Sequence, residues 1–313
     1  MRMLVIGAGA TGGFFGGRLA QAGRDVTFLV RPARRETLMR DGLQIVSPGG
    51  VSSVRPKLAL AGEIDGPYDL VLLTVKAFAL EPAIADMRQA VGPQTAILPT
   101  LNGMRHLDVL DEAFSPANVM GCLARIVGSI DDKGRIVQAT PMNDLVYGER
   151  DGMRSKRAEN IDAFMQGAGF NARLSDAIVP EMWTKWVMLA SLAAITCLMR
   201  GTIGEVASAE GGLECAGRIL EEVESIVAKV GAPTPPAAFA AIRAMLTDPG
   251  SGMTASLYRD LVTGQPVEIE ILGDLIRRGD EAGIDSPLVH AAAVTLRMYE
   301  AARQAKAGRG SGN

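Results

Sequence analysis

The residues that build metal centres, disulfide frameworks and aromatic surfaces are scarce in this chain. Aromatic side chains make up 4% of the 313 residues, and His106 and His290 are the only histidines. The cysteines Cys122, Cys197 and Cys215 are scattered and form no CxxC pair. Such a set signals neither a disulfide framework nor a zinc site, and it leaves little room for a Ser–His–Asp triad. We therefore expect no metal and an intracellular protein.

An excess of either charge is also missing. The 32 lysines and arginines nearly balance 35 acidic residues, for a formal charge of -3 at pH 7. A nucleic-acid-binding domain would show a basic patch or stripe, and adhesion to an anionic membrane needs clustered basic residues. We expect neither nucleic acid nor membrane as a partner.

Long apolar runs are absent too. The longest uncharged apolar stretch, Trp186 to Met199, is bounded by Lys185 and Arg200. A membrane-spanning helix needs about 20 such residues, so this stretch indicates a buried helix. The opening MRMLVIGAGA turns glycine-rich too soon for a signal peptide. The expected location is cytoplasmic.

The chain does have an ordinary globular composition, and strand and helix signals alternate along its first half. Hydrophobic residues make up 48% and charged residues 21%, and the length favours two domains. Short apolar runs separated by helical segments predict βαβ units and a parallel sheet. The strands are expected at residues 3–6, 25–30, 68–75 and 95–98, with antiparallel edge strands at 119–127, 136–139 and 144–148.

After Pro180 the pattern becomes helical. Glycine and proline separate the helical runs, which are expected at residues 181–199, 213–230, 236–246, 267–282 and 287–305. We predict an α/β protein with a Rossmann-type dinucleotide-binding domain over residues 1–176 and an all-helical domain over residues 177–313.

The first strand is followed by the pattern GxGxxG. Gly7 permits the tight turn, Gly9 lets the backbone approach a pyrophosphate, and Gly12 allows close helix–strand packing. Ala10 and Thr11 belong to the helix N-terminus, whose N–H groups and dipole favour an anion. The strand–turn–helix context favours dinucleotide binding over a merely structural turn.

The end of the second strand indicates which dinucleotide binds. An NAD-preferring fold usually places an acidic residue about 20 residues after the glycines. Here the strand ends at Arg31, followed by Arg34 and Arg35, and Glu36 is the first acid. A guanidinium pairs bidentately with a 2′-phosphate. The pattern favours NADPH over the alternative of a solvated basic turn.

Further polar residues lie where open α/β sheets bind ligands. Lys76 and Asn102 follow two expected strands at their carboxyl ends, although each residue taken singly is also an ordinary surface or turn residue. Lys185 begins an apolar helix, either in an exposed first turn or in a cleft. A partly desolvated lysine has a lowered pKa and suits proton transfer.

Taken together, these motifs resemble the ketopantoate reductases (2-dehydropantoate 2-reductases) over nearly the whole chain. The family has GxGxxG, an arginine after the second strand, a lysine after the fourth and an Asn-Gly pair after the fifth. It also has a tryptophan two residues before a catalytic lysine, and S-x-x-x-D followed by E-I-[DE]. The matching residues are Gly7, Gly9, Gly12, Arg31, Lys76, Asn102, Gly103, Trp183, Lys185, Ser256, Asp260 and Glu268-Ile269-Glu270.

The resemblance implies NADPH-dependent reduction of a 2-keto acid at a site between the two domains. Lys185 would protonate the carbonyl oxygen as hydride arrives, and Glu268 would belong to the acid–base network. Ser256 and Asn102 would hold the substrate, with Asn102 and Lys76 also facing the cofactor. The partner is then a small-molecule 2-keto acid, and a homodimer stays open as the assembly.

One departure affects the substrate. Well-known family members carry asparagines four and eight residues after the lysine, whereas this chain has Leu189 and Ala193. We therefore expect ketopantoate reductase-like chemistry, as in pantothenate biosynthesis, or reduction of a more apolar 2-keto acid. A non-catalytic NADP-binding sensor and an S-adenosylmethionine-dependent methyltransferase are the weaker alternatives.

Overall fold

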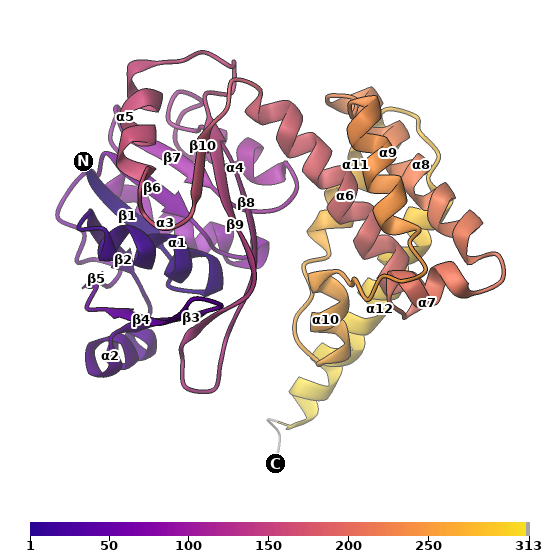
Figure 1. The fold of residues 1–313 in the computed structure, drawn as a ribbon, viewed down its shortest axis with the longest axis horizontal. Coiled ribbons are helices and arrows are strands. Elements are labelled where there is room, and N and C mark those ends of the chain that lie inside the picture. The colour runs from indigo at the N-terminus through magenta and orange to yellow at the C-terminus, as the bar shows by residue number, and fades with distance from the viewer. Residues whose placement is uncertain (311–313) are drawn as a thin grey trace. The chain divides into compact units, whose positions relative to one another are not determined.

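The computed structural model describes residues 1–310, with the side chains of residues 1–306. The chain divides into two compact units, seen in Figure 1. The first unit contains residues 1–101 and 105–179, and the second contains residues 102–104 together with the chain from residue 180 onward.

A five-stranded parallel sheet forms the centre of the first unit. Ile6 at the end of the middle strand lies opposite both Leu29 and Leu73. Since all neighbouring pairs run parallel, the carboxyl ends of the strands lie at one edge of the sheet. The order is β5 (Lys57–Ala59), β2 (Asp25–Leu29), β1 (Arg2–Ile6), β6 (Leu70–Leu73) and β7 (Ala96–Pro99). The four strands expected for this sheet are confirmed, and β5 is an addition.

Helices lie between the strands of the first unit. The first helix carries Phe14 and Phe15, both fully buried, and the Phe15 ring meets Phe170 edge-on at 5.0 Å. Burying two aromatic side chains on one helix supplies a large part of the apolar contact that holds it to the sheet. The helices are α1 (Ala10–Gln21), α2 (Pro32–Asp41), α3 (Leu80–Met87), α4 (Arg105–Ala113) and α5 (Lys156–Met165).

A second sheet corrects the expected edge strands. Residues 136–139 and 144–148 form one continuous strand, β9 (Ile136–Gly148), rather than two. This strand is antiparallel only to β8 (Gly121–Ile130), and it pairs in parallel with β3 (Leu43–Ser47) and β10 (Asn171–Leu174). β4 (Gly50–Val54) completes the sheet beyond β3. The polar residues between the two predicted segments are tolerated because they are only partly buried or exposed.

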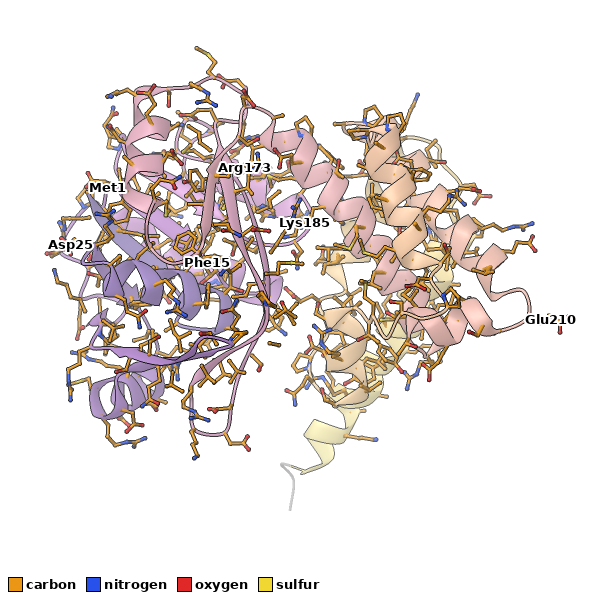
Figure 2. The ribbon with its side chains drawn as sticks, viewed as in Figure 1. Met1, Phe15, Asp25, Arg173, Lys185 and Glu210 are labelled. Carbon is orange, nitrogen blue, oxygen red and sulfur yellow. The ribbon has the colours of Figure 1, made fainter. Side chains whose placement is uncertain are left out.

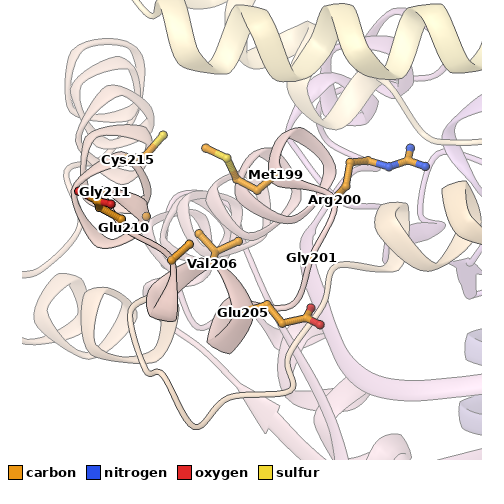
Figure 3. Close-up of a pocket in the computed structure, with 10 residues that line it drawn as sticks. Met199, Arg200, Gly201, Glu205, Val206, Glu210, Gly211 and Cys215 are labelled. Carbon is orange, nitrogen blue, oxygen red and sulfur yellow. The ribbon is translucent and has the colours of Figure 1, made fainter.

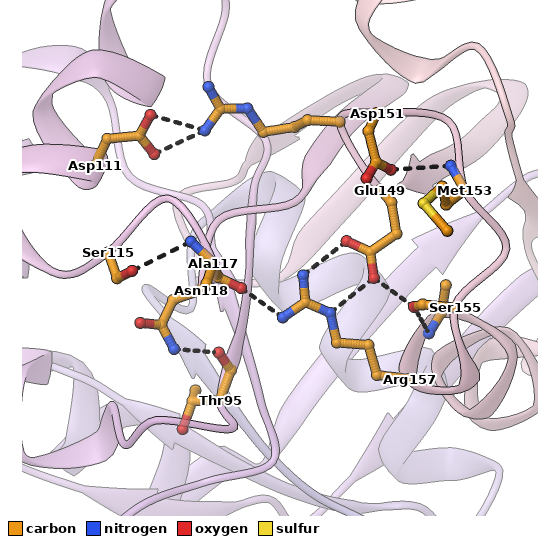
Figure 4. A network of polar contacts seen from close by, with 12 residues as sticks. Thr95, Asp111, Ser115, Ala117, Asn118, Glu149, Asp151, Met153, Ser155 and Arg157 are labelled. Atoms are coloured by element: carbon orange, nitrogen blue, oxygen red, sulfur yellow. Dashed lines mark hydrogen bonds and ion pairs between the residues drawn. The ribbon is translucent and has the colours of Figure 1, made fainter.

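A polar network fixes the chain after β9. The Glu149 carboxylate is 9% exposed and accepts hydrogen bonds from Arg157 Nε and Nη2 at 2.7 and 2.6 Å, and one from Ser155 (Figure 4). Ser155 also caps α5, accepting from the Ala158 N–H. The hydrogen bonds from Arg157 are the main cause that holds the pKa of Glu149 below its usual value.

The second unit is built from helices, as the pattern predicts. The central helix, α8 (Gly212–Val230), packs against four others. They are α7 (Ile203–Ser208), α9 (Pro236–Leu246), α11 (Glu270–Glu281) and α12 (Pro287–Gly310), and the unit also contains α6 (Ile178–Met199) and α10 (Ser256–Val262).

The structure changes two helix starts that concern the site. α6 begins at Ile178 instead of residue 181, because Pro180 is tolerated in a first turn whose N–H groups lack helical partners. α11 begins at Glu270 instead of residue 267, so Glu268 lies in the turn before it.

α6 is also long and apolar enough to cross a membrane, with a mean hydropathy of 1.4. However, 67% of its apolar window is buried in the structure, as in the core helix of a folded domain.

Candidate functional site

The glycine-rich turn between β1 and α1 has the geometry of a pyrophosphate cradle. Gly7 has a φ of +96°, which an L side chain rarely adopts, and a Cβ at Gly12 would lie 2.2 Å from the Gly7 carbonyl oxygen. A Cβ at Gly9, in contrast, would meet nothing within 4 Å. Gly9 is also the N-cap of α1, and it has no side chain to occupy the first-turn N–H groups around Ala10 and Thr11. The turn therefore fits a bound phosphate group.

Thr74, just beyond β6, holds this turn in place. Its hydroxyl donates to the Ile6 carbonyl at 2.8 Å and lies 3.1 Å from the Gly7 carbonyl. The same oxygen would be 2.2 Å from a Cβ at Gly12. Sequence reasoning missed this role, because a threonine at the end of a strand gives no signal of which carbonyl it will meet 67 residues away.

The three arginines after β2 have different environments in the structure. Arg35 forms an ion pair with Glu63 at 2.7 Å. Arg34 is half-buried and donates to the Ala8 carbonyl at 3.2 Å and to Gly134 at 2.9 Å, and burial lowers its pKa. Arg31 is exposed, and its guanidinium forms no ion pair or side-chain hydrogen bond with the described residues. Of the three, Arg31 is the one available to a ligand.

Lys76 belongs to the same edge of the first unit. It is exposed and lies three residues beyond the end of β6, directly before a short 3-10 turn at Ala77–Ala79. The edge thus brings together the glycine turn, Arg31 and Lys76, because β1, β2 and β6 are neighbours in one parallel sheet. Of the predicted cofactor residues, only Asn102 belongs to the other unit.

The predicted catalytic lysine lies on α6 in the second unit. Lys185 is partly buried and is the eighth residue of that helix, shown in Figure 2. Leu189, one turn later, is also partly exposed, so it shares an accessible face with Lys185. Ala193 is 1% exposed and packs inside the unit. Leu189 is therefore the accessible member of the pair that replaces the family's asparagines.

The remaining predicted residues also belong to the second unit. Ser256 is exposed at the start of α10, and Glu268 is partly buried in the turn before α11. Asn102 and Gly103 are grouped with the same unit although they follow β7 in the chain. The Asn102 amide makes no side-chain hydrogen bond within the described part of the chain.

A surface pocket of about 520 Å³ lies elsewhere in the helical unit. It is bounded by the end of α6, by α7 and by the start of α8, with Arg200, Glu205 and Cys215 among its lining residues (Figure 3). No residue predicted from the motifs lines it. The pocket therefore does not report on the predicted chemistry.

Known proteins resemble this chain along its length. It is 35% identical over 302 residues to an uncharacterised oxidoreductase of Bacillus subtilis, covering 96% of this chain and 99% of that protein. A ketopantoate reductase structure from Ralstonia eutropha has a TM-score of 0.87 at 24% identity, covering 97% and 100% of the two chains. D-mandelate dehydrogenase with NADH and anilino(oxo)acetate has a TM-score of 0.85 at 21% identity, covering 97% and 99%.

The two structural likenesses are below 25% identity and show a shared fold. The family models decide the membership. "Ketopantoate reductase PanE/ApbA" matches residues 3–152, and the C-terminal model of the same family matches residues 177–300. The chain is therefore an oxidoreductase of the ketopantoate reductase family.

Proposed function

We propose that this oxidoreductase uses NADPH to reduce a 2-keto acid to the 2-hydroxy acid. The observation that carries the proposal is the sheet edge of the first unit. There an open glycine turn at Gly9 and an exposed Arg31, whose guanidinium pairs with none of the described side chains, both suit phosphate groups. The turn would receive the pyrophosphate, and Arg31 the 2′-phosphate that distinguishes NADPH from NADH.

The second unit supplies the proton chemistry. When bound, the nicotinamide supplies the hydride for the keto carbon. Lys185 would give a proton to the keto oxygen as the hydride reaches the keto carbon, so that the C=O group becomes CH–OH. Glu268 takes part in the acid–base network, and Ser256 and Asn102 hold the substrate. These roles follow from the family motifs that the residues match.

The choice of NADPH over NADH rests on Arg31. D-mandelate dehydrogenase, which shares the fold, is described with NADH, so the fold alone does not select the phosphorylated cofactor. Here no acidic side chain occupies the end of β2, and Arg35 is already paired with Glu63. This arrangement supports NADPH as the cofactor.

Within this reaction class, the substrate is either ketopantoate or a more apolar 2-keto acid. Leu189 shares the accessible face of α6 with Lys185 and offers no hydrogen bond. A substrate hydroxyl buried against it without another partner would lose about 1–3 kcal/mol. Leu189 therefore favours a substrate with an apolar side chain, such as 2-ketoisovalerate or a larger analogue.

Steady-state kinetics with the purified chain test the proposal. NADPH consumption is followed with ketopantoate, 2-ketoisovalerate and larger aliphatic and aromatic 2-keto acids, and each active substrate is repeated with NADH. We expect turnover with at least one apolar keto acid and preference for NADPH. A kcat/KM for ketopantoate tenfold or more above that of every apolar analogue would restore ketopantoate as the substrate. Cofactor binding without any turnover would indicate the sensor alternative.

A further inference from the structure

Trp186, directly after Lys185, is fixed by a hydrogen bond that crosses the helical unit. Its side chain is 1% exposed, and its Nε1–H donates to the Ile271 carbonyl of α11 at 2.9 Å. The Ile271 N–H in turn donates to the Glu268 carbonyl at 3.2 Å. One residue of α11 therefore links the indole on the lysine helix to the backbone of Glu268.

The same indole lies against the loop that carries Asn102. Gly103 has a φ of +80°, and a Cβ built on it would lie 3.6 Å from Trp186 Cε2. Residues 102–104 belong to the compact unit that contains α6 and α11. Since an added Cβ would already meet the ring at ordinary van der Waals distance, the loop backbone runs beside the Trp186 indole.

A second tryptophan supports the ring of the first. The Trp183 and Trp186 rings have centroids 5.3 Å apart at an interplanar angle of 32°. Trp183 is itself held close to the chain at Gly231, where a Cβ would be only 2.4 Å from the ring. Its indole nitrogen makes no hydrogen bond with the described residues. The two tryptophans therefore differ in one respect that matters here, the hydrogen bond of Trp186.

We propose that Trp186 is a positioning residue, which sets Lys185, Asn102 and Glu268 relative to one another through the indole. The inference rests on the proposed function and adds a residue that the family motifs do not include. Reacting groups must be held to within about 0.5 Å, and a displacement of about 1 Å costs on the order of 100-fold in rate. The three segments are far apart in the sequence, and a rigid ring with one directed N–H connects them.

The test compares Trp186→Phe with Trp183→Phe in the full chain. Both substitutions remove the same atoms from the same helix, but only Trp186→Phe removes a hydrogen bond. We expect Trp186→Phe to lower kcat on the order of 10- to 100-fold, with the KM for NADPH unchanged and the pH profile of kcat shifted. Trp183→Phe should lower kcat less and leave the pH profile as in the wild type.

A spectroscopic measurement keeps the proposal testable if Trp186→Phe does not fold. The chain has two tryptophans, so Trp183→Phe leaves Trp186 as the only one. Its fluorescence should respond when a keto acid binds with NADP⁺, because the Asn102 loop runs beside this ring.

Several outcomes would overturn the inference. Wild-type kcat and pH profile in Trp186→Phe would do so, as would equal losses in both variants or a silent Trp186 fluorescence. Absence of any turnover by the wild type on the keto acid panel would instead remove the proposed function, and the inference with it.

Discussion

At the scale of single residues, the arginines after β2 show that identical side chains can differ in their partners. The exposed Arg31 guanidinium has no partner in the part of the chain that the structure describes, whereas Arg35 forms an ion pair with Glu63. Arg31→Ala should remove a charge-assisted hydrogen bond worth about 1.5–3 kcal/mol. NADPH binding should then weaken at least about tenfold, and NADH binding should hardly change. Titration of the purified protein with each cofactor measures both constants.

Arg35→Ala is the matched control for this prediction. It removes the same charge four residues later but breaks only a surface ion pair, which contributes little to stability. Both cofactors should bind to it as they do to the wild type. If Arg31→Ala weakens NADPH and NADH equally, then Arg31 serves the loop rather than the 2′-phosphate.

At the scale of elements, the proposed function predicts that the exposed face of α6 determines substrate choice. Leu189→Asn places an amide one turn from Lys185, at a partly exposed position. A net hydrogen bond contributes about 0.5–1.5 kcal/mol. The ratio of kcat/KM for ketopantoate over 2-ketoisovalerate should therefore rise about three- to tenfold. Competition between the two keto acids measures this ratio directly.

Ala193→Asn provides the comparison on the same helix. Ala193 is 1% exposed, so an amide there would be buried without a prepared partner. Such a burial costs about 1–3 kcal/mol. The expected result is a lower Tm without the gain in selectivity. An unchanged substrate ratio in Leu189→Asn would show that this face of α6 does not contact the substrate.

Between β9 and α5, the Glu149 network makes stability depend on pH. The pKa of Glu149 is lowered in the folded state, chiefly by the hydrogen bonds from Arg157. Its contribution is therefore complete above the ordinary value of 4.5 and is lost as the pH falls through the lower folded-state pKa. Glu149→Gln should lower the free energy of unfolding at pH 7 by about 1–3 kcal/mol, and the two proteins should converge in acid.

Urea unfolding at a series of pH values measures this difference. Glu214→Gln serves as the control, because Glu214 and its partner Arg218 are 69% and 67% exposed, and such a pair contributes little. A constant difference between wild type and Glu149→Gln from neutral pH down to pH values below 4.5 would contradict the assigned linkage.

At the scale of the whole molecule, binding and proton transfer are assigned to different compact units. The glycine turn and Arg31 belong to the first unit, and Lys185 belongs to the second. General acid catalysis by a positioned side chain contributes about 10²–10⁴-fold. Lys185→Ala should lower kcat by that order and leave the Kd for NADPH unchanged. Single-turnover kinetics and cofactor titration of the same preparation separate the two effects.

Arg31→Ala should show the opposite behaviour, with weaker NADPH binding and a kcat near the wild-type value at saturating cofactor. A Lys185→Ala variant that keeps its kcat would remove the proton-transfer role from this residue. A variant that loses NADPH binding would contradict the division of labour between the two units.

The sequence by itself determined the features that are written in a few consecutive residues. The glycine turn, four of the parallel strands and the lysine helix all follow from local patterns of spacing and polarity. They are confirmed because a backbone requirement such as the φ of +96° at Gly7 must be met by the residue at that position. The sequence pattern predicts two segments where β9 is continuous, because partly exposed residues in the middle of the strand hide the alternation.

Only the tertiary structure decided which side chains meet. The Thr74 hydroxyl donates to the Ile6 carbonyl, 68 residues away in the sequence. The Trp186 indole donates to the Ile271 carbonyl, 85 residues away. The Glu222 carboxylate of α8 accepts from the Leu288 and Val289 N–H groups at the start of α12, again 66 or 67 residues along the chain. Local patterns do not encode such partners, because hydrogen bonds between distant segments depend on how the helices and strands pack. The same packing pairs Arg35 with Glu63 and leaves the Arg31 guanidinium exposed. The positions of Arg31, Arg34 and Arg35 in the sequence do not reveal this difference.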